Sequence, residues 1–394
     1  MQLDLFKMTK LQQENLKAAI HAYEKQSPIS SPSPPVLYIE LTKNCIGRCA
    51  FCHGPQWMNK PEFTMRDDIF NIILRDYAPY AALVDLRGWG ESLMLPRFPE
   101  YVEKIAQFHP QIRLTTTLGC GSEKALQSLI DHDVFVSVSF DAADKALYES
   151  IRQGISYETV IKNIEFVTRG ILKKYGSLEG RFRLGVVPLQ FLNLAQLEKI
   201  LELASKYQIP EVRICPLTSD HRNPNLLEHH MQETIQALLR AIDQAGKKGI
   251  RLQFGYTPFK ELTLPDKKFD RCCHPWLYTF INYAGDIGFC DHILLVTKNK
   301  AMGHIMQEKA SIWNGEKYQR IRTIHCAKVR SDLPLQCQGC YLKGRYAEHE
   351  HELAVIFKRW HVGGPEKKQQ LLCHQADPFR RIFGALKYWL RQRI

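Results

Sequence analysis

Three cysteines, Cys45, Cys49 and Cys52, lie within eight residues of one another, directly after the apolar run 36–41. Three thiolates can bind three irons of a [4Fe-4S] cluster and leave the fourth iron open to a chelating ligand, as catalytic metal sites keep a vacant position. A zinc knuckle that lacks one ligand, or chance clustering, would present the same residues. The interpretation of these three cysteines as a [4Fe-4S] site therefore depends on further motifs in the right order.

A second set of cysteines lies downstream. Cys272 and Cys273 are adjacent, Cys290 follows, and the sequence CQGC places Cys337 and Cys340 two residues apart. These thiols are enough for one fully ligated iron-sulfur cluster. A structural zinc site with four cysteine ligands is the alternative on spacing alone.

Short strand-like runs alternate with amphipathic helical stretches over residues 36–256. Serial strand-helix units imply a parallel sheet with helices outside, and right-handed crossovers favour a curved, partly closed barrel. The active site of such a fold lies at the carboxyl ends of the strands, where the loop with the first three cysteines begins. The six predicted strands are 36–41, 82–88, 113–118, 134–141, 181–189 and 211–217.

The remaining segments set the domain boundaries. We expect a helix over residues 10–25 with Leu11, Leu16, Ile20 and Tyr23 near one face, then a Pro- and Ser-rich linker or brace to residue 35. The fold class is α/β: a partial (β/α)6 TIM-like barrel over 36–256, a small iron-sulfur domain over 257–345 and a basic helical extension over 346–394.

Composition narrows the functional classes. The chain has 53 Lys and Arg against 41 Asp and Glu, a formal charge of +12, which suggests an acidic partner. No nucleic-acid motif accompanies the charge, so no nucleic acid is expected. With no secretory signal and no apolar run of about 18 residues, we expect a cytoplasmic protein. In that reducing compartment, twelve clustered cysteines indicate metal binding or catalysis.

The spacing Cys45-x3-Cys49-x2-Cys52, with the aromatic Phe51 before the last cysteine, resembles the signature of the radical S-adenosylmethionine (SAM) superfamily. The resemblance implies that the open iron binds the amino and carboxylate groups of SAM. One electron from the cluster would then cleave SAM to a 5′-deoxyadenosyl radical.

Further motifs of that family follow in order. The sequence LRGWGES resembles the family's Gly-Gly-Glu motif, which implies that Gly88, Gly90 and Glu91 meet the SAM amino group. The sequence VSVSFDA resembles its ribose motif, and a following helix resembles the segment with an arginine for the SAM carboxylate. The implied residues are Ser139 and Asp141 for the ribose and Arg152 for the carboxylate. Two positions depart from the family pattern: Trp89 stands in place of the motif's second glycine, and Leu118 stands where relatives often have asparagine.

Residues 272–340 resemble the auxiliary-cluster domains called SPASM and twitch. The spacing from Cys272 to Pro275-Trp276, the turn glycine Gly285 and the position of Cys290 carry the resemblance, with Cys273 as the alternative to Cys272. Residues 341–352 contain no cysteine, which implies one auxiliary [4Fe-4S] cluster and a twitch rather than a full SPASM domain.

The number of predicted clusters and the spacing of the cysteines most resemble the group of the butirosin-pathway aminocyclitol dehydrogenase. That resemblance implies oxidation or rearrangement of a sugar- or aminocyclitol-like small molecule, with the auxiliary cluster accepting an electron and a flavodoxin- or ferredoxin-type donor supplying one. Candidate catalytic residues near the sixth strand are Cys215, Asp220, His221 and Arg222, although solvated loop residues would look the same.

Two other functions fit the same motifs. One is radical modification of a ribosomally made peptide, by epimerisation, cross-linking or oxidation. The 35 residues before the first strand are too few for the peptide-recognition domain that many such enzymes carry, which favours a small molecule. The other is a non-catalytic iron-sulfur protein. The basic segment 364–394 could dock on a membrane surface or an acidic partner, or pack on the barrel.

Overall fold

The computed structural model describes residues 8–52, 60–217, 222–254, 272–290, 301–327, 332–334 and 337. The predicted extension 346–394 and the candidates Asp220, His221 and Cys340 lie outside these residues. Within them, no helix is long and apolar enough to cross a membrane.

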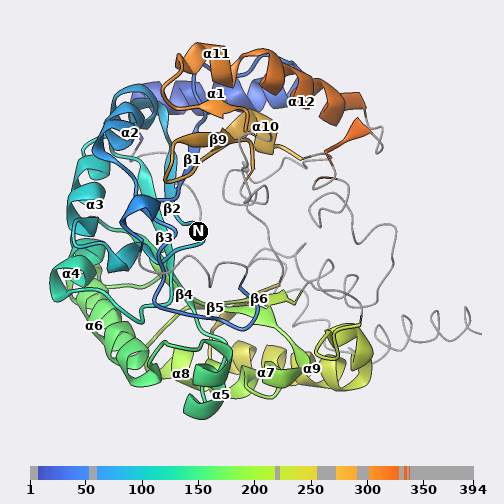
Figure 1. Cartoon of the computed structure of the whole chain (residues 1–394). Coiled ribbons are helices and arrows are strands. Elements are labelled where there is room, and N and C mark those ends of the chain that lie inside the picture. Colours follow the sequence, from blue (N-terminus) through green and yellow to red (C-terminus); the bar gives the residue numbers. More distant parts are fainter. Residues whose placement is uncertain are drawn as a thin grey trace, which may run out of the picture.

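A curved sheet, with strand order β10-β9-β8-β1-β2-β3-β4-β5-β6-β7, organises the molecule (Figure 1). Strands β1 to β7 are all parallel to their neighbours, and β8 is also parallel to β1. The strands are β1 Val36–Ile39, β2 Leu83–Leu86, β3 Gln111–Thr116, β4 Phe135–Ser139, β5 Phe182–Leu189, β6 Glu211–Pro216, β7 Arg251–Phe254, β8 Tyr278–Ile281, β9 Asp286–Gly288 and β10 Gly303–His304.

The helices form an arc around the outer face of this sheet (Figure 1). They are α1 Lys10–Glu24, α2 Asp67–Ile72, α3 Phe98–Ala106, α4 Glu123–Asp131, α5 Lys145–Ile151, α6 Tyr157–Tyr175, α7 Phe191–Leu194, α8 Leu197–Lys206, α9 Met231–Lys247, α10 His274–Leu277, α11 Lys309–Trp313 and α12 Glu316–Ala327. Shorter turns are the 3-10 helices Pro61–Phe63, Ala78–Tyr80, Ser92–Met94 and Leu227–His229 and the π-helical turn Ile73–Tyr77.

Alternation along the strands separates two faces of the sheet. Residues such as Val84, Leu114 and Leu184 are fully buried in the core that the outer helices cover. Their sequence neighbours point to the concave side because side chains alternate along a strand. Several of these neighbours are charged and form ion pairs. Asp85 pairs with Arg113 on β3 and with Arg87 directly after its own strand, and Glu211 pairs with Arg183 on β5 and Arg251 on β7.

The Glu211 carboxylate lies between two arginines, 3.3 Å from Arg183 Nη1 and 2.7 Å from Arg251 Nη2. Burial alone would raise the pKa of Glu211, but the two cations lower it to about 2. Glu211 and Arg251 are the first residues of β6 and β7, so this ionic cluster lies at the end of the barrel opposite the active-site end predicted from the sequence.

The partial parallel barrel predicted from the sequence is confirmed, and the sheet is wider than the six predicted strands. Residues 251–254 form the parallel strand β7 beside β6. On the other edge, β8 pairs with β1 in the register Val36 to Tyr278 and Ile39 to Ile281. The iron-sulfur region therefore continues the barrel sheet through β8, and β9 and β10 add antiparallel strands.

The N-terminal segment ties these parts together. Helix α1 packs on α10, where the rings of Tyr23 and Trp276 meet edge to face at 5.4 Å. The following Pro- and Ser-rich segment acts as a brace, because Trp276 Nε1 donates to Ser27 O at 2.7 Å and Trp313 Nε1 donates to Ser31 O at 2.8 Å. Leu11, predicted on the apolar face of α1, is instead 44% exposed, because it lies one position away from the buried stripe.

Candidate active site at the mouth of the barrel

The cysteine loop after β1 is held against the end of α5. Arg48 N donates to Gln153 O at 2.7 Å, and Ala50 N donates to Ile151 O at 3.0 Å. These contacts place Cys49 in a buried position, while Cys45 and Cys52 are half-buried. The loop therefore lies at the carboxyl end of β1.

The surroundings of the sulfurs suit thiolate ligands. Cys45 Sγ accepts a hydrogen bond from the N–H of Gly47 at 3.4 Å, and Cys49 Sγ accepts one from Arg152 Nη1 at 3.6 Å. Burial raises the pKa of Cys45 to about 12, and the neighbouring carboxylate and thiols add to the rise. Without a cation the Cys45 thiol would stay protonated, so bound iron would be what turns it into a thiolate.

Within the described ranges, no three Cys, His, Asp or Glu side chains converge closely enough to bind one metal ion. A [4Fe-4S] cluster does not need such convergence, because each thiolate binds a different iron. The three sulfurs of the loop fit that donor set, and two of them accept hydrogen bonds, Cys45 from within the loop and Cys49 from Arg152.

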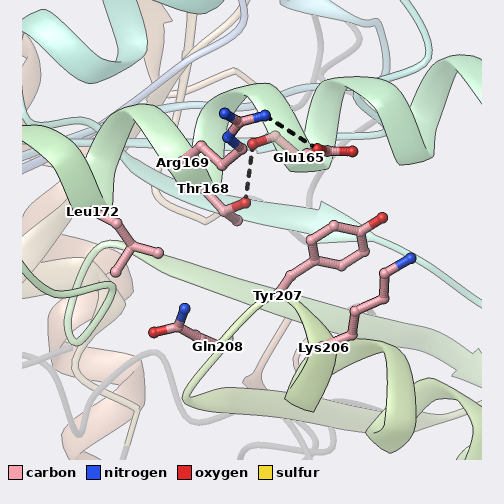
Figure 2. Close-up of a pocket in the computed structure, with 7 residues that line it drawn as sticks. All are labelled: Glu165, Thr168, Arg169, Leu172, Lys206, Tyr207 and Gln208. Atoms are coloured by element: carbon pink, nitrogen blue, oxygen red, sulfur yellow. Dashed lines mark hydrogen bonds and ion pairs between the residues drawn. The ribbon is translucent and has the colours of Figure 1, made fainter.

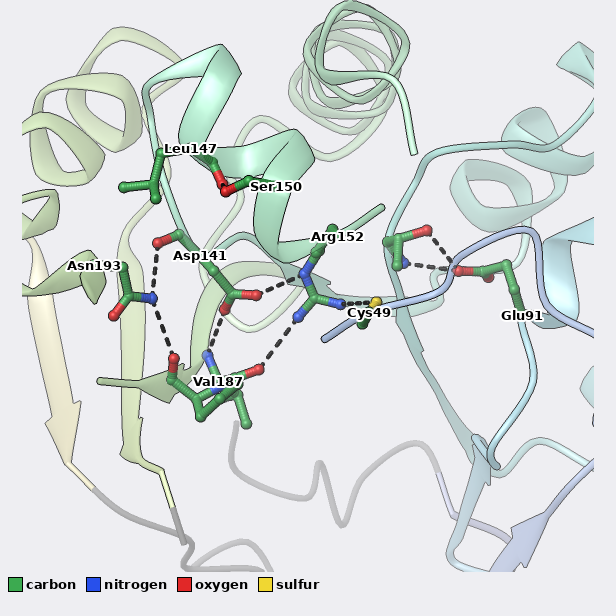
Figure 3. Close-up of polar contacts among 10 residues, drawn as sticks. Cys49, Glu91, Asp141, Leu147, Ser150, Arg152, Val187 and Asn193 are labelled. Atoms are coloured by element: carbon green, nitrogen blue, oxygen red, sulfur yellow. Dashed lines mark hydrogen bonds and ion pairs between the residues drawn. The ribbon is translucent and has the colours of Figure 1, made fainter. Parts of the chain in front are cut away.

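A buried ion pair connects the cysteine loop to β4 and β5 (Figure 3). Arg152 Nε lies 2.7 Å from Asp141 Oδ2, and Arg152 Nη2 donates to Val187 O at 3.2 Å. Asp141 Oδ1 accepts from the N–H of Val187 at 2.9 Å. The guanidinium also lies 5.3 Å from the centre of the Phe51 ring. Three regions predicted separately as cofactor contacts thus meet around one arginine.

Both partners of this pair are almost completely shielded from solvent, with Asp141 0% and Arg152 5% exposed. Burial raises the pKa of Asp141, and the charge of Arg152 offsets part of that rise. Ser139, the other predicted ribose contact, is half-buried at the last position of β4.

The loop GWGE is packed directly on the cysteine loop. Glu91 N donates to Asn44 O at 2.8 Å, and a side chain at Gly90 would place its Cβ 2.3 Å from Thr42 O. No residue other than glycine fits at position 90 without moving the backbone of the cysteine loop.

The Glu91 carboxylate is buried and accepts four hydrogen bonds. Its donors are Thr116 Oγ1 at 2.7 Å, Thr117 N and Thr117 Oγ1 at 2.8 Å each, and Leu93 N at 3.4 Å. A carboxylate has about four acceptor positions, so these donors occupy them. Glu91 therefore joins the GWGE loop to the end of β3.

Leu118, where the sequence departs from the family pattern, lies in the left-handed region with φ 53°. Asparagine adopts this conformation more readily than leucine. The Leu118 side chain is fully buried, and its carbonyl accepts from Asn163 Nδ2 at 2.8 Å. The loop thus contributes packing at this position.

Sequence reasoning missed Glu40, a buried carboxylate at the end of β1. Glu40 Oε1 accepts from the N–H of Trp89 at 2.9 Å, and a side chain at Gly88 would place its Cβ 2.3 Å from Glu40 Cγ. Burial raises the pKa of Glu40 to about 7, although the N–H groups of Trp89 and Tyr283 and the charge of Lys43 oppose the rise. Its only sequence signal is an acidic residue at the end of an apolar strand.

Three cysteines of the second set flank α10 and the β8–β9 hairpin: Cys272, Cys273 and Cys290. Cys272, Cys273 and Cys290 are buried, and Cys337 is half-buried. Cys273 belongs to the apolar cluster of Tyr23, Tyr38 and Trp276. Cys290 Sγ lies 3.0 Å from Nδ1 of His274, a contact that sequence analysis did not predict.

Cys215 lies near the end of β6, and it is buried. Burial raises its pKa to about 11, while Arg213 and Arg183 oppose the rise. A cavity of about 330 Å³ lies elsewhere, between α6 and the end of α8, with Glu165, Thr168, Arg169, Leu172, Lys206, Tyr207 and Gln208 around it (Figure 2). None of the predicted site residues lines it.

Comparisons with known proteins agree with this geometry. The sequence model of the radical SAM superfamily matches residues 39–204, and that of the iron-sulfur cluster-binding domain SPASM matches residues 272–341. The GTP 3′,8-cyclase of Streptomyces coelicolor is 26% identical over 138 residues, which are 32% of this chain and 39% of that protein. The chain thus spans about two fifths of the length of this curated relative.

Solved structures of low sequence identity share the fold. Streptococcus suis SuiB bound to its precursor peptide SuiA superposes with a TM-score of 0.57 and 14% identity, over 79% of this chain and 71% of that one. For anSMEcpe with bound AdoMet the TM-score is 0.58 and the identity 15%, over 77% of this chain and 88% of that one. The likeness to these structures concerns the fold. The two matched sequence models together span more than half of the residues, and they place the chain in the radical SAM superfamily as an enzyme with a C-terminal SPASM domain.

Proposed function

We propose that the chain cleaves SAM at the cysteine loop and uses the resulting radical to remove a hydrogen atom from its substrate. The observation that carries this proposal is the meeting of Cys49, Asp141 and Arg152 at the mouth of the barrel. A [4Fe-4S] cluster on Cys45, Cys49 and Cys52 would supply the electron for homolytic cleavage of the sulfonium.

The surrounding side chains position the cofactor in this proposal. Arg152 offers positive charge to the SAM carboxylate, and Asp141 keeps the guanidinium in place while Ser139 faces the ribose. Because protein donors already occupy the Glu91 carboxylate, backbone carbonyls of the loop at Gly88 and Gly90 are better suited to accept hydrogen bonds from the SAM ammonium group.

For the second cysteine set, we propose one auxiliary [4Fe-4S] cluster of the twitch type within residues 257–345, bound by Cys272, Cys290, Cys337 and Cys340. Burial of Cys273 among apolar side chains supports Cys272 as the first ligand, since a cluster ligand must reach the other sulfurs. A fully ligated cluster has no open iron, so electron transfer is the chemistry it would supply.

The proposed reaction is oxidation of a hydroxyl-bearing small molecule, such as a sugar or aminocyclitol. The substrate radical would lose one electron to the auxiliary cluster and one proton to a base, for which Asp220 and His221 are the candidates. The raised pKa of Cys215 suits a neutral thiol at this end of β6, so Cys215 is less suited to act as the base.

A peptide substrate is the second candidate. Its support is the fold shared with SuiB and anSMEcpe, both of which have been solved with bound peptides. Both candidates require the same radical generation. They differ only in what occupies the concave side of the sheet.

Anaerobically reconstituted protein with dithionite, or with a reduced flavodoxin, should convert SAM to 5′-deoxyadenosine. The variant Cys49→Ala should abolish this conversion, and zinc in place of iron at the loop would refute the proposal. Deuterium transfer from labelled sugars, aminocyclitols or peptides into 5′-deoxyadenosine would identify the substrate class. If SAM is not converted under any condition, the result would support the hypothesis of a non-catalytic iron-sulfur protein.

A further inference from the structure

We propose that His274 raises the reduction potential of the auxiliary cluster by donating a hydrogen bond to the sulfur of Cys290. The inference rests on the proposed function in one respect, because it takes Cys290 as a ligand of that cluster. It adds a residue outside the cysteine pattern, and it explains how this cluster would be suited to accept an electron.

The contact is short and enclosed. His274 Nδ1 lies 3.0 Å from Cys290 Sγ, and the histidine side chain is 1% exposed. His274 is the first residue of α10, and its ring is fixed edge to face against Tyr278 at 4.2 Å. A ring held in this way cannot turn to water, so its Nδ1 stays directed at the sulfur.

The direction of the hydrogen bond follows from the chemistry of the sulfur. A thiolate bound to iron has no proton to give, so the proton between the two atoms must belong to Nδ1 of His274. A donor directed at a cluster sulfur stabilises the electron-rich reduced state more than the oxidised state. Hydrogen bonding to the sulfur therefore makes the cluster a better electron acceptor.

The surroundings strengthen this effect. Tyr318 and Phe289 are fully buried, and the Tyr318 hydroxyl donates to Gly288 O at 3.3 Å, two residues before Cys290. Arg322 places a buried cation in the same region, and its Nε donates to Pro275 O at 2.8 Å, next to His274. In such a low-dielectric environment each hydrogen bond and charge acts more strongly than in water.

The electron that the cluster gains would come from the substrate radical. That radical loses one electron and one proton and becomes the oxidised product, so one reduction of the cluster balances each oxidation. A higher potential at the cluster makes this transfer more favourable.

The test compares potentials in a form with one cluster. In a chain with Cys45, Cys49 and Cys52 changed to alanine, only the auxiliary cluster remains for potentiometric titration by electron paramagnetic resonance. We expect His274→Leu to lower the potential by about 59 mV, a tenfold change in a one-electron equilibrium. His274→Asn, which keeps a donor near the Nδ1 position, should restore most of the loss.

His304→Leu is the matched control, because the His304 ring contacts Ala284 O and the N–H of Met306 rather than a sulfur. An unchanged potential in His274→Leu with a full complement of iron would overturn the inference and leave the proposed cluster intact. Absence of iron from the single-cluster chain itself would instead refute the proposed ligand set.

A second measurement needs no substitution at His274. In the single-cluster chain labelled with ¹⁵N-histidine, pulsed paramagnetic resonance of the reduced cluster should detect a weak nitrogen coupling, as expected through a hydrogen bond. A strong coupling would mean that a histidine binds iron directly, and no coupling would mean that the contact is absent. Either result would contradict the inference.

Discussion

The Asp141–Arg152 pair illustrates what one buried charge requires of its neighbours. Its two side chains are buried and lie 2.7 Å apart. Replacing Arg152 by methionine would leave the Asp141 carboxylate buried without its cation, which should cost about 3–5 kcal/mol in the free energy of unfolding. Urea denaturation under anaerobic conditions would measure this loss.

The matched comparison is the double variant Asp141→Asn with Arg152→Met, which should recover part of the lost stability because no unpaired charge remains. Arg66→Met, which breaks an exposed pair with Asp68, should change little. Equal losses in the single and the double variant would contradict a role for the pair in compensating charge.

Glu40 should make stability depend on pH. Its pKa is about 7 in the folded protein against an ordinary 4.5, so between these values the folded state keeps a proton that the unfolded state has lost. Stability therefore falls as the pH rises through this window. Relative to Glu40→Gln, the native protein should lose about 2–3 kcal/mol between about pH 5 and pH 8.

Urea midpoints of the two proteins across this range would test the Glu40 prediction, since the difference between them removes the contribution of other groups. Parallel pH profiles would show that Glu40 titrates normally.

At the scale of elements, the loop between β2 and α3 depends on glycines for close approach. Because a Cβ at Gly88 would lie 2.3 Å from Glu40 Cγ, Gly88→Ala should displace Glu40 and destabilise the fold by about 1–3 kcal/mol. The Trp89 N–H would lose its acceptor at the same time. Thermal unfolding of the two proteins would measure the difference.

Gly246 provides the control for this substitution. It lies in α9 with nothing within 4 Å of the added Cβ, so Gly246→Ala should stabilise the protein by about 0.5–1 kcal/mol through higher helix propensity. Similar effects of the two substitutions would contradict the steric argument at Gly88.

At the scale of the whole molecule, the barrel and the iron-sulfur region should unfold together. Strand β8 is paired with β1, and Arg322 Nη1 of the iron-sulfur region donates to Pro28 O at 2.9 Å in the N-terminal brace. Burial lowers the pKa of Arg322 to about 10. Hydrogen bonds to carbonyl oxygens therefore have to replace water around this guanidinium. Separating the two parts would expose it together with the apolar cluster of Tyr23, Tyr38 and Trp276.

We therefore expect a single cooperative transition in urea. Far-ultraviolet circular dichroism, which is dominated by the helices of the barrel, and tryptophan fluorescence, to which Trp276 and Trp313 contribute, should give the same midpoint. Two separate midpoints would show that the iron-sulfur region is an independent domain.

The sequence by itself determined the cofactor chemistry and the architecture. Cys45, Cys49 and Cys52 lie on one short loop, so their spacing along the chain already restricts the group that they can bind. Alternating strand and helix patterns likewise predict a parallel sheet, because each crossover depends on local hydrophobic periodicity. The family resemblance pointed to Asp141 and Arg152 as well.

Only the tertiary structure decided which side chains meet. The contact between Arg152 and Cys49 joins residues 103 positions apart, and that between Glu40 and Trp89 joins residues 49 apart. The approach of His274 to Cys290 depends on how α10 and the β8–β9 hairpin pack. Such contacts follow from strand register and from the burial of charge in the assembled core, and no local pattern in the sequence encodes either of these.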